Sequence, residues 1–322
     1  MKLLLTVTMN PALDKTVSVD GFELGSTNRI RSMRLDAGGK GINVAKVLKG
    51  FDTNVSAFGL QAGSMGKAMR QKLTALGIPH RFLEAEGETR TNLKIVDERS
   101  QVTTELNEPG FRVTPELLEE LVGEYRQALD DAAVVVLSGS LPPGAPADFY
   151  RTLIQIAKEK QVPAILDADG MALAHGVKAS PYAIKPNLRE LERLTGLALK
   201  SDEDILAAAR QLISEGTQLV LVSMGGEGSL LVSKGLAIRA KPFPIKPQST
   251  VGAGDSMVAA LAYSLLNEQP PETIARLTSA AGTITATKPG TDVCTLDEVM
   301  EKLPLVNISY PIHSNEKREE SI

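Results

Sequence analysis

The chain has 322 residues, which at about 150 residues per domain allows two ordinary domains or one large α/β domain. Hydrophobic residues make up 43% of the chain and charged residues 23%, so the composition is that of a globular protein and excludes a disordered one. The net charge of −4 provides no general attraction to nucleic acid or to an anionic membrane, and we expect partners of neither kind.

The chain begins with a short run of leucine and β-branched residues that stops at Asn10-Pro11, and this run predicts a buried strand. Similar apolar runs follow, and amphipathic helical stretches precede several of them. Such alternation is typical of a doubly wound α/β fold, in which helices cover both faces of a mostly parallel sheet. The further predicted strands are 133–137, 164–166, 182–184 and 219–222, and the predicted helices are 115–129, 148–159 and 202–214.

Two stretches, 16–36 and 89–106, interrupt this alternation. Their side chains alternate with a period of two, which is typical of half-exposed antiparallel strands rather than buried parallel ones. We expect them to form one small β-sheet, discontinuous in sequence, that projects from the core as a lid. The chain then consists of a single α/β domain over residues 1–312, with the lid inserted, and a solvated C-terminal tail over 313–322.

Polar residues near the first strand predict a ligand site. Asp14 follows this strand, and open α/β sheets bind ligands outside the carboxyl ends of their strands. The glycines at 38–41 allow the backbone to approach a sugar closely, and Asn43, in the helix that follows, can offer its amide to a hydroxyl group. A turn-stabilising role for Asp14 and a capping role for Asn43 are the plainer alternatives.

The segment Ser249-Thr250-Val251-Gly252-Ala253-Gly254-Asp255-Ser256 precedes a helical run at 257–266. Small residues let backbone N–H groups converge at a helix N-terminus, where the helix dipole favours an anion. A carboxylate in that turn, Asp255, is placed to accept a proton, so the segment indicates phosphoryl transfer. The plainer interpretation is an N-cap aspartate after a glycine turn.

The sequence resembles the PfkB carbohydrate kinases, which have a ribokinase-like fold. The resemblance extends from Thr8 to about Thr291 and rests on several motifs in the family's order. These motifs lie at 38–45, 138–144, 185–190, 223–228 and 250–255. A P-loop of the usual pattern is missing. A Rossmann fingerprint is missing too, and its absence disfavours a nicotinamide-dependent dehydrogenase.

The resemblance implies ATP-dependent phosphorylation of a sugar hydroxyl. Asp255 would take the proton from that hydroxyl, while the N–H groups of Gly252, Ala253 and Gly254 stabilise charge on the transferring phosphoryl group. Asp14 would accept hydrogen bonds from sugar hydroxyls. The residues expected to bind the substrate are Asp14, Arg29, Gly38, Gly39, Lys40, Asn43, Arg90 and Ser138.

The same resemblance implies ATP and Mg²⁺ as cofactors. It assigns the loop at 223–228 to the nucleotide, although these residues also suit a glycine hairpin. It assigns Asn187 and Glu190 to the region around magnesium and the phosphates, largely through waters, although the spacing also suits a helix cap. The expected nucleotide-binding residues are Lys185, Asn187, Ser223, Gly225, Gly228, Ser279 and Thr283, with Glu190 as the metal residue.

The substrate class follows from three cations. Lys40, Arg29 and Arg90 lie in the glycine motif and the lid segments, and a sugar that already carries a phosphate needs cations away from the reacting end. A solvated lid face is the alternative explanation. Within the family, the motifs are most similar to those of kinases that convert fructose 1-phosphate to fructose 1,6-bisphosphate. Tagatose 6-phosphate and then fructose 6-phosphate are the alternative substrates.

A sugar-phosphate sensor without catalytic activity is a hypothesis of another class, but a sensor has no need of the base Asp255. Lid sheets in this family often pair between subunits, which implies a homodimer through the lid. Neither the single cysteine nor the short apolar start suggests export, so we expect a cytoplasmic protein.

Overall fold

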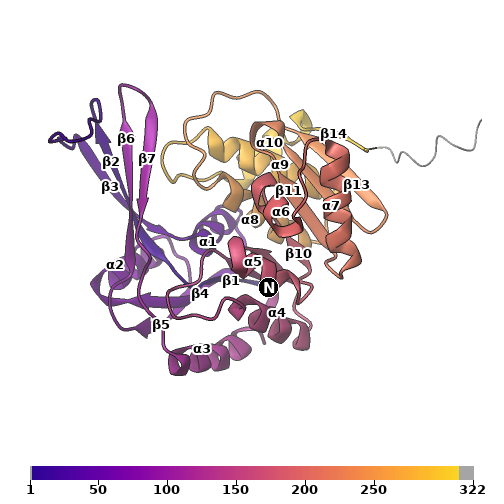
Figure 1. Ribbon diagram of the computed structural model, residues 1–322, viewed down its shortest axis with the longest axis horizontal. Helices are drawn as coiled ribbons and strands as arrows, with labels where there is room; N and C mark the ends of the chain where they lie inside the picture. The colour runs from indigo at the N-terminus through magenta and orange to yellow at the C-terminus, as the bar shows by residue number, and fades with distance from the viewer. Residues whose placement is uncertain (1, 312–322) are drawn as a thin grey trace, which may run out of the picture.

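The computed structural model describes residues 2–311, and the predicted tail at 313–322 therefore lies outside the described residues. A large sheet runs through the molecule in the strand order β14-β13-β12-β11-β10-β9-β8-β1-β4-β5 (Figure 1). Its strands are β1 (Leu3–Thr8), β4 (Val55–Ala62), β5 (His80–Ala85), β8 (Ala132–Ser138), β9 (Ala164–Asp167), β10 (Ala183–Ile184), β11 (Leu219–Ser223), β12 (Ser229–Ser233), β13 (Leu236–Lys241) and β14 (Asn307–Ser309).

The strands from β5 to β11 are parallel, and β12, β13 and β14 continue the sheet in antiparallel fashion. The prediction of a mostly parallel sheet is therefore confirmed. β4 and β5 have no counterpart among the predicted strands, because Gly59 and Gln61 interrupt the apolar run of β4 and β5 carries charged residues.

Helices cover both faces of the sheet, as predicted. β1 shows why: Leu4 joins one buried apolar cluster, while Leu5 and Val7 join the other. One face carries α1 (Lys40–Gly50), α2 (Gly63–Ala75), α8 (Ala253–Leu266), α9 (Pro271–Ala286) and α10 (Leu296–Lys302). The other carries α3 (Pro115–Ala128), α4 (Phe149–Glu159), α5 (Gly170–Val177), α6 (Leu188–Thr195) and α7 (Asp202–Ser214).

The amphipathic helices predicted at 115–129, 148–159 and 202–214 agree with α3, α4 and α7 to within one residue at either end. α8 begins at Ala253, four residues before the predicted start, because the left-handed conformation of Gly252 (φ 77°) already ends the preceding loop. Short 3₁₀ helices occur at η1 (Gly225–Glu227) and η2 (Leu303–Leu305). Within residues 2–311, every helix is too short or too polar to cross a lipid bilayer.

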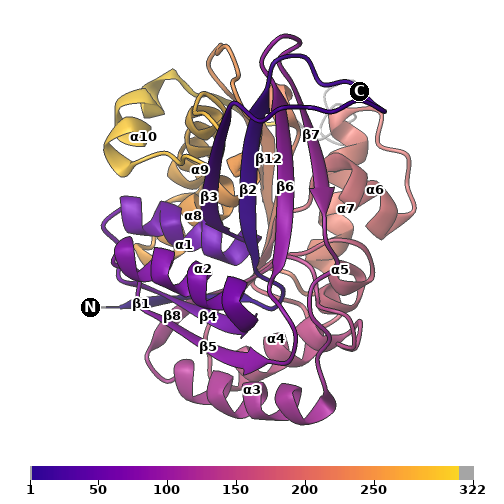
Figure 2. The ribbon, with the colours of Figure 1, turned by 90° about the vertical axis from the view of Figure 1, so that its left-hand side faces the viewer.

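A second, smaller sheet stands beside the core and forms the lid (Figure 2). Its strand order is β3-β2-β6-β7, with β2 (Ala12–Val19), β3 (Ser32–Gly38), β6 (Arg90–Asp97) and β7 (Val102–Asn107). The two separate segments thus join into one sheet, as predicted. The expectation of antiparallel pairing is wrong for β2 and β6, which are parallel. These two strands come from different segments, so no hairpin dictates their relative direction.

Two glycines allow close packing where the lid meets the core. A Cβ atom on Gly41, at the start of α1, would lie 2.7 Å from the carbonyl oxygen of Val7 and closer still to the Thr8 hydroxyl. A Cβ atom on Gly38 would lie 2.5 Å from the Asp14 carboxyl carbon. The close neighbours of these glycines are therefore the end of β1 and the side chain of Asp14 in the lid.

Replacing Gly41 with alanine is expected to destabilise the fold by about 1–3 kcal/mol, because the backbone of β1 must move to admit the methyl group. Urea denaturation measures this free energy of unfolding. The matched control is Gly123→Ala in α3, where an added Cβ meets nothing within 4 Å and should stabilise the protein by about 0.4–1 kcal/mol. Equal stability of Gly41→Ala and the wild type would contradict this packing argument.

Candidate active site

The carboxyl ends of the central parallel strands bring polar side chains together. Thr8 ends β1, Ser138 ends β8, Asp167 ends β9, and Lys185 directly follows β10. The Thr8 and Ser138 hydroxyls and Asp167 Oδ2 are buried without a hydrogen-bond partner among the described residues. Buried polar atoms normally have partners, so these orphans indicate a place for a ligand or ordered water. This edge of an open α/β sheet is also where ligands are expected.

The N-terminus of α8 supplies backbone donors. Gly252 is its N-cap and provides no side-chain cap. The N–H of Ala253 donates to the Thr250 carbonyl at 3.3 Å, whereas those of Gly252 and Gly254 donate to no partner in the described chain. Of the predicted anion hole, Gly252 and Gly254 are therefore available, and Ala253 is already engaged. A phosphoryl group placed here would meet free N–H groups and the positive end of the helix dipole.

Asp255 lies in the first turn of α8 and is buried. Asn43 Nδ2 donates a hydrogen bond to Asp255 Oδ2 at 2.8 Å. Burial, together with the nearby Asp167 carboxylate, raises the pKa of Asp255 above its ordinary value, although Lys40, Asn43 and Lys185 act in the opposite direction. A buried carboxylate with a raised pKa is well suited to accept a proton.

Two lysines share one oxygen of Asp167. Lys40 Nζ lies 3.1 Å and Lys185 Nζ 3.5 Å from Asp167 Oδ1. Burial disfavours the ionised Asp167, but the two ammonium groups outweigh burial and lower its pKa. Burial also opposes the charge on Lys40, yet Asp167, Asp255 and Glu190 together raise the pKa of this lysine. Asp167 and Lys40 therefore each favour the charged form of the other.

The position of Lys40 bears on its predicted role. The sequence suggested that Lys40 clamps a phosphate remote from the reacting end, whereas the structure places its ammonium beside Asp167. α1 begins at Lys40 and packs against α8. The lysine therefore lies beside Asp167, and the charge of Asp255 also raises its pKa. Lys185 lies there too, because its ammonium is 3.5 Å from the position of a Cβ atom on Gly254.

The lid contributes a cluster around Asp14 that sequence reasoning missed. Asn92 Nδ2 donates to Asp14 Oδ1 at 3.1 Å, and Lys94 Nζ lies 2.9 Å from Asp14 Oδ2. Asp14 and Lys94 are both buried. The signal was present in the alternation of β6, where Asn92 and Lys94 share one face of the strand and Leu93 lies on the other.

The two predicted lid arginines have different positions. Arg90 donates to the Asn10 carbonyl at 3.1 Å, and its Nε atom is buried without a partner in the described chain. Burial lowers its pKa, against the pull of Asp14. Arg29 is exposed in the loop beyond the last β2–β3 pair, Ser18 with Ser32. At about 3.3 Å per residue this pair is roughly 13 Å along the lid from Asp14, so Arg29 does not join the site.

The predicted nucleotide-binding residues lie toward the antiparallel part of the sheet. Ser223 ends β11 and pairs with Asn187 through an isolated bridge. The loop that follows is indeed a hairpin, with positive φ at Gly225 (55°) and Gly228 (92°). On α9, the Ser279 hydroxyl is buried without a partner in the described chain, and the Thr283 hydroxyl donates to the Ser279 carbonyl at 2.7 Å.

Asn187 and Glu190 form a capping box at the start of α6. Asn187 Oδ1 accepts from the Glu190 N–H, and Glu190 Oε2 accepts from the Asn187 N–H, each at 2.9 Å. The capping interpretation is thus confirmed, and Glu190 also lies near enough to Lys40 for its charge to raise the pKa of that lysine. Among residues 2–311, no three His, Cys, Asp or Glu side chains gather closely enough to hold a metal ion by themselves.

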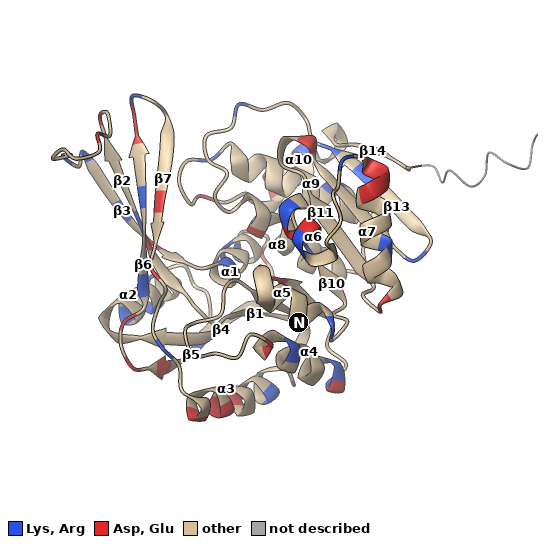
Figure 3. Cartoon of the chain, in the orientation of Figure 1, with Lys and Arg blue, Asp and Glu red and all other residues tan. Residues whose placement is uncertain are grey.

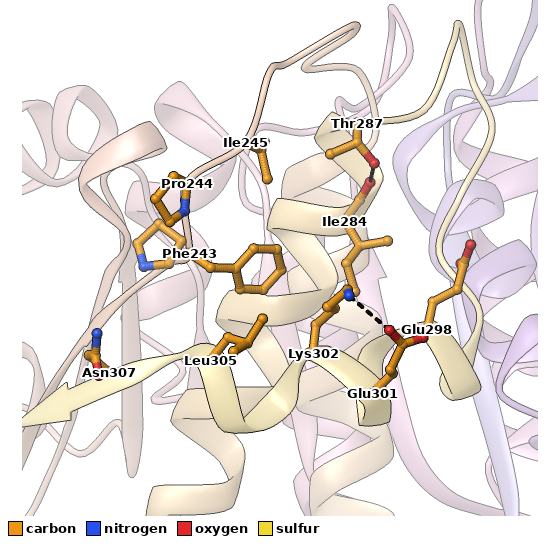
Figure 4. A pocket seen from close by; sticks show the side chains of 11 residues that line it. Phe243, Pro244, Ile245, Ile284, Thr287, Glu298, Glu301, Lys302, Leu305 and Asn307 are labelled. Atoms are coloured by element: carbon orange, nitrogen blue, oxygen red, sulfur yellow. Dashed lines mark hydrogen bonds and ion pairs between the residues drawn. The ribbon is translucent and has the colours of Figure 1, made fainter.

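A cavity of about 730 Å³ lies elsewhere, between the segment after β13, the end of α9 and α10 (Figure 4). Phe243, Ile284 and Leu305 line its apolar part, and none of the predicted site residues lines it. The predicted site residues therefore lie outside this cavity.

Basic and acidic residues are mixed over most elements of the chain (Figure 3), in keeping with its small net charge.

Comparisons with known proteins agree with this geometry. A family model described as pfkB family carbohydrate kinase matches residues 7–298. The 1-phosphofructokinase of Xanthomonas campestris pv. campestris is 40% identical over 281 residues, which are 86% of this chain and 88% of the relative. The ATP-dependent 6-phosphofructokinase isozyme 2 of Mycobacterium tuberculosis is 36% identical over 297 residues, 92% of this chain and 87% of the relative.

Among solved structures, the phosphofructokinase-2 of Escherichia coli in complex with potassium is similar, with a TM-score of 0.90 and 30% identity. The match covers 95% of this chain and 99% of that chain. The likeness therefore extends over the core and the lid together.

Replacing Asp255 with asparagine is expected to raise the melting temperature at pH 8. The folded-state pKa of Asp255 is above its unfolded value, so the stability that its protonated form contributes is lost as the pH rises through the folded pKa. The gain should therefore shrink toward pH 4. Thermal unfolding at both pH values measures this difference.

Asp204→Asn is the control of opposite sign. Hydrogen bonds from the backbone N–H of Lys200 and from Ser201 lower the pKa of Asp204, so this variant should lose stability at pH 8 and lose less as the pH falls. A lower melting temperature of Asp255→Asn at pH 8 would show that the ionised carboxylate is not a cost to the fold.

Proposed function

The chain belongs to the pfkB family of carbohydrate kinases, and we propose that it uses ATP to phosphorylate fructose 1-phosphate, giving fructose 1,6-bisphosphate. The observation that carries this proposal is the position of Asp255, a buried carboxylate in the first turn of α8 with free backbone N–H groups beside it. Lys40 and Lys185 add positive charge at the same place.

In this mechanism Asp255 accepts the proton of the sugar hydroxyl as the hydroxyl oxygen attacks the γ-phosphorus of ATP. The bond from the γ-phosphorus to the β,γ-bridging oxygen breaks, and ADP leaves. Phosphoryl transfer depends mainly on positioning and electrostatics, so a base in line with the reacting hydroxyl is sufficient proton chemistry.

The charge that builds up on the transferring group requires donors. The N–H groups of Gly252 and Gly254 supply two, and the positive end of the α8 dipole supports them. Lys40 takes a new role in this scheme. Because Lys40 and Lys185 both lie beside Asp167, we assign them to the transferring phosphoryl group rather than to the phosphate of the sugar.

Magnesium fits this site as an ion held by few protein groups. Glu190 offers one carboxylate oxygen, and its charge reaches Lys40. Mg²⁺ commonly keeps several waters and binds phosphate oxygens directly, so a cluster of carboxylates is unnecessary. When bound with ATP, the ion would neutralise charge on the β- and γ-phosphates. Asn187, Ser223 and the 225–228 loop would face the nucleotide, and Ser279 and Thr283 would lie nearer its adenine ring.

The sugar phosphate would bind between the lid and the strand ends. Asp14, held by Asn92 and Lys94, keeps lone pairs for sugar hydroxyls. Ser138, Asn43 and the backbone at Gly38 and Gly39 would complete this wall. Arg90 has a buried, unpartnered Nε atom and is the cation that we assign to the substrate phosphate.

Tagatose 6-phosphate and fructose 6-phosphate are the alternative substrates, and one relative is a 6-phosphofructokinase. All three ketohexose phosphates satisfy the same need for a cation remote from the reacting hydroxyl. The preference for fructose 1-phosphate rests on the 1-phosphofructokinase relative, which is 40% identical against 36% for the 6-phosphofructokinase, and on Lys40 within the glycine motif.

The proposed assembly is a homodimer through the outer face of the lid. Two cross-strand rows line this face, Leu35–Lys15–Leu93–Leu106 and Met33–Val17–Ile95–Thr104. Met33 and Leu106 are each 56% exposed, and β7 is exposed along its whole length. Val17 and Ile95 at the centre of this face are already buried, so the exposed apolar side chains Met33 and Leu106 at its edges are the ones that a second copy of the chain would cover.

Asp255→Asn is expected to lower turnover by about 10²-fold or more, because the sugar hydroxyl then lacks its base. A coupled assay of ADP release measures turnover on fructose 1-phosphate, tagatose 6-phosphate and fructose 6-phosphate side by side, with the first used best. Near-normal turnover of the variant removes Asp255 from this role. A wild type that binds these sugars without releasing ADP would instead be a sensor.

Arg90→Met and Lys40→Met should separate the two cations. Losing one charge-assisted contact costs about 1.5–3 kcal/mol, so Arg90→Met should raise the KM for the sugar phosphate roughly tenfold to a hundredfold. Lys40→Met should mainly lower kcat. Steady-state kinetics at saturating ATP distinguish these effects. A large rise in the sugar KM on replacing Lys40, with kcat unchanged, would restore the remote-clamp assignment.

A further inference from the structure

Lys46 lies one turn beyond Asn43 on α1, on the same helical face. Its Nζ atom donates to Asn43 Oδ1 at 3.3 Å, and Asn43 Nδ2 donates to Asp255 Oδ2 at 2.8 Å. Asn43 and Asp255 are buried, and Lys46 is half-buried. The three side chains thus form a chain of hydrogen bonds that ends on the proposed base.

The order of atoms in this chain has a chemical cause. An ammonium group has donors and no acceptor, so only the amide oxygen of Asn43 can face Lys46. The amide nitrogen must then face Asp255. Without the lysine, the amide can turn over and place its oxygen against the carboxylate.

We propose that Lys46 is a positioning residue, which fixes the orientation of the Asn43 amide so that this amide donates to Asp255. The proposal rests on the proposed function of Asp255 as the base. It assigns Lys46 no contact with the sugar or the nucleotide.

Lys46 is an unusual lysine for a merely structural role. It forms no ion pair within the described chain, and burial, above all, lowers its pKa. Asp36 and Asp14 attract its charge, while Lys94 and Arg34 repel it. Both carboxylates have other partners: Asp36 binds Arg34 and Thr291, and Asp14 binds Asn92 and Lys94. The neutral amide of Asn43 is what remains for Lys46.

The orientation of Asn43 bears on the protonation of Asp255. The groups that face Asp255 are Asp167, Lys40, Lys185 and Asn43, and the hydrogen bond from Asn43 favours its ionised form. An amide oxygen turned toward the carboxyl would favour the protonated form instead. Loss of Lys46 should therefore raise the pH at which the base becomes ionised.

The test compares Lys46→Met with the wild type by the pH dependence of kcat/KM between pH 5 and 9. Lys46→Met should move the acid limb upward by up to about one pH unit, so that kcat/KM falls up to about tenfold near pH 6 and much less at pH 8. Lys46→Arg retains a cationic donor and should rescue the profile. Lys49→Met, at the exposed last turn of the same helix, is the matched control and should leave the profile unchanged.

A double-mutant cycle asks whether Lys46 acts through Asn43. In an Asn43→Leu background there is no amide to orient, so Lys46→Met should have no further effect on the acid limb. Lys46→Gln serves if the methionine variant does not fold, and its limb should also move upward, because the shorter glutamine amide can donate or accept and so does not fix the orientation of Asn43. An equal loss of kcat at every pH, or effects that add in the double mutant, would overturn the proposal.

This test is separate from the substrate assignment. If the wild type phosphorylates tagatose 6-phosphate or fructose 6-phosphate but not fructose 1-phosphate, the substrate assignment fails, and the same pH profiles are recorded with the sugar that reacts. If Asp255→Asn retains normal turnover, the base assignment fails, and the proposal for Lys46 fails with it.

Discussion

The packing of the first turn of α1 against the first turn of α8 is the constraint on which the site depends. It buries Asp255 beside Asn43, and it brings Lys40 to Asp167. Burial disfavours the charges of Lys40 and Asp167, but each charge stabilises the other, which raises the pKa of Lys40 and lowers that of Asp167. The glycine at position 41 permits the close approach of α1 to β1, because the backbone of β1 occupies the space that a side chain would need.

The lid extends the same arrangement to the sugar. Parallel pairing of β2 with β6 joins segments about 80 residues apart and places Asp14 opposite Asn92. The lid also connects directly to α1 through Gly38 and Gly39, so any movement of the lid bears on the helix that orients the base. The segment from β2 to α1 thus contributes both Asp14 of the lid and Asn43, the hydrogen-bond partner of Asp255.

Local patterns predicted the parts of the protein that depend on local order. The amphipathic period found α3, α4 and α7, and the small residues before Asp255 indicated an anion site at a helix start. The positions of Lys40 and Lys94 could not be predicted in this way, because they depend on helix packing and on strand pairing between distant segments. The position of Arg29 could not be predicted for a related reason, because the length of the β2–β3 hairpin carries it away from Asp14 of the same chain.

The central claim is that Asp255 is the base and that burial sets its pKa, and the pH profile of kcat/KM for the wild type and Asp255→Asn tests it most directly. The account predicts an acid limb in the wild type above the ordinary aspartate range, because burial raises the pKa of this carboxyl. It predicts that the limb is absent from the residual activity of the variant. An acid limb that is identical in both proteins would contradict the account.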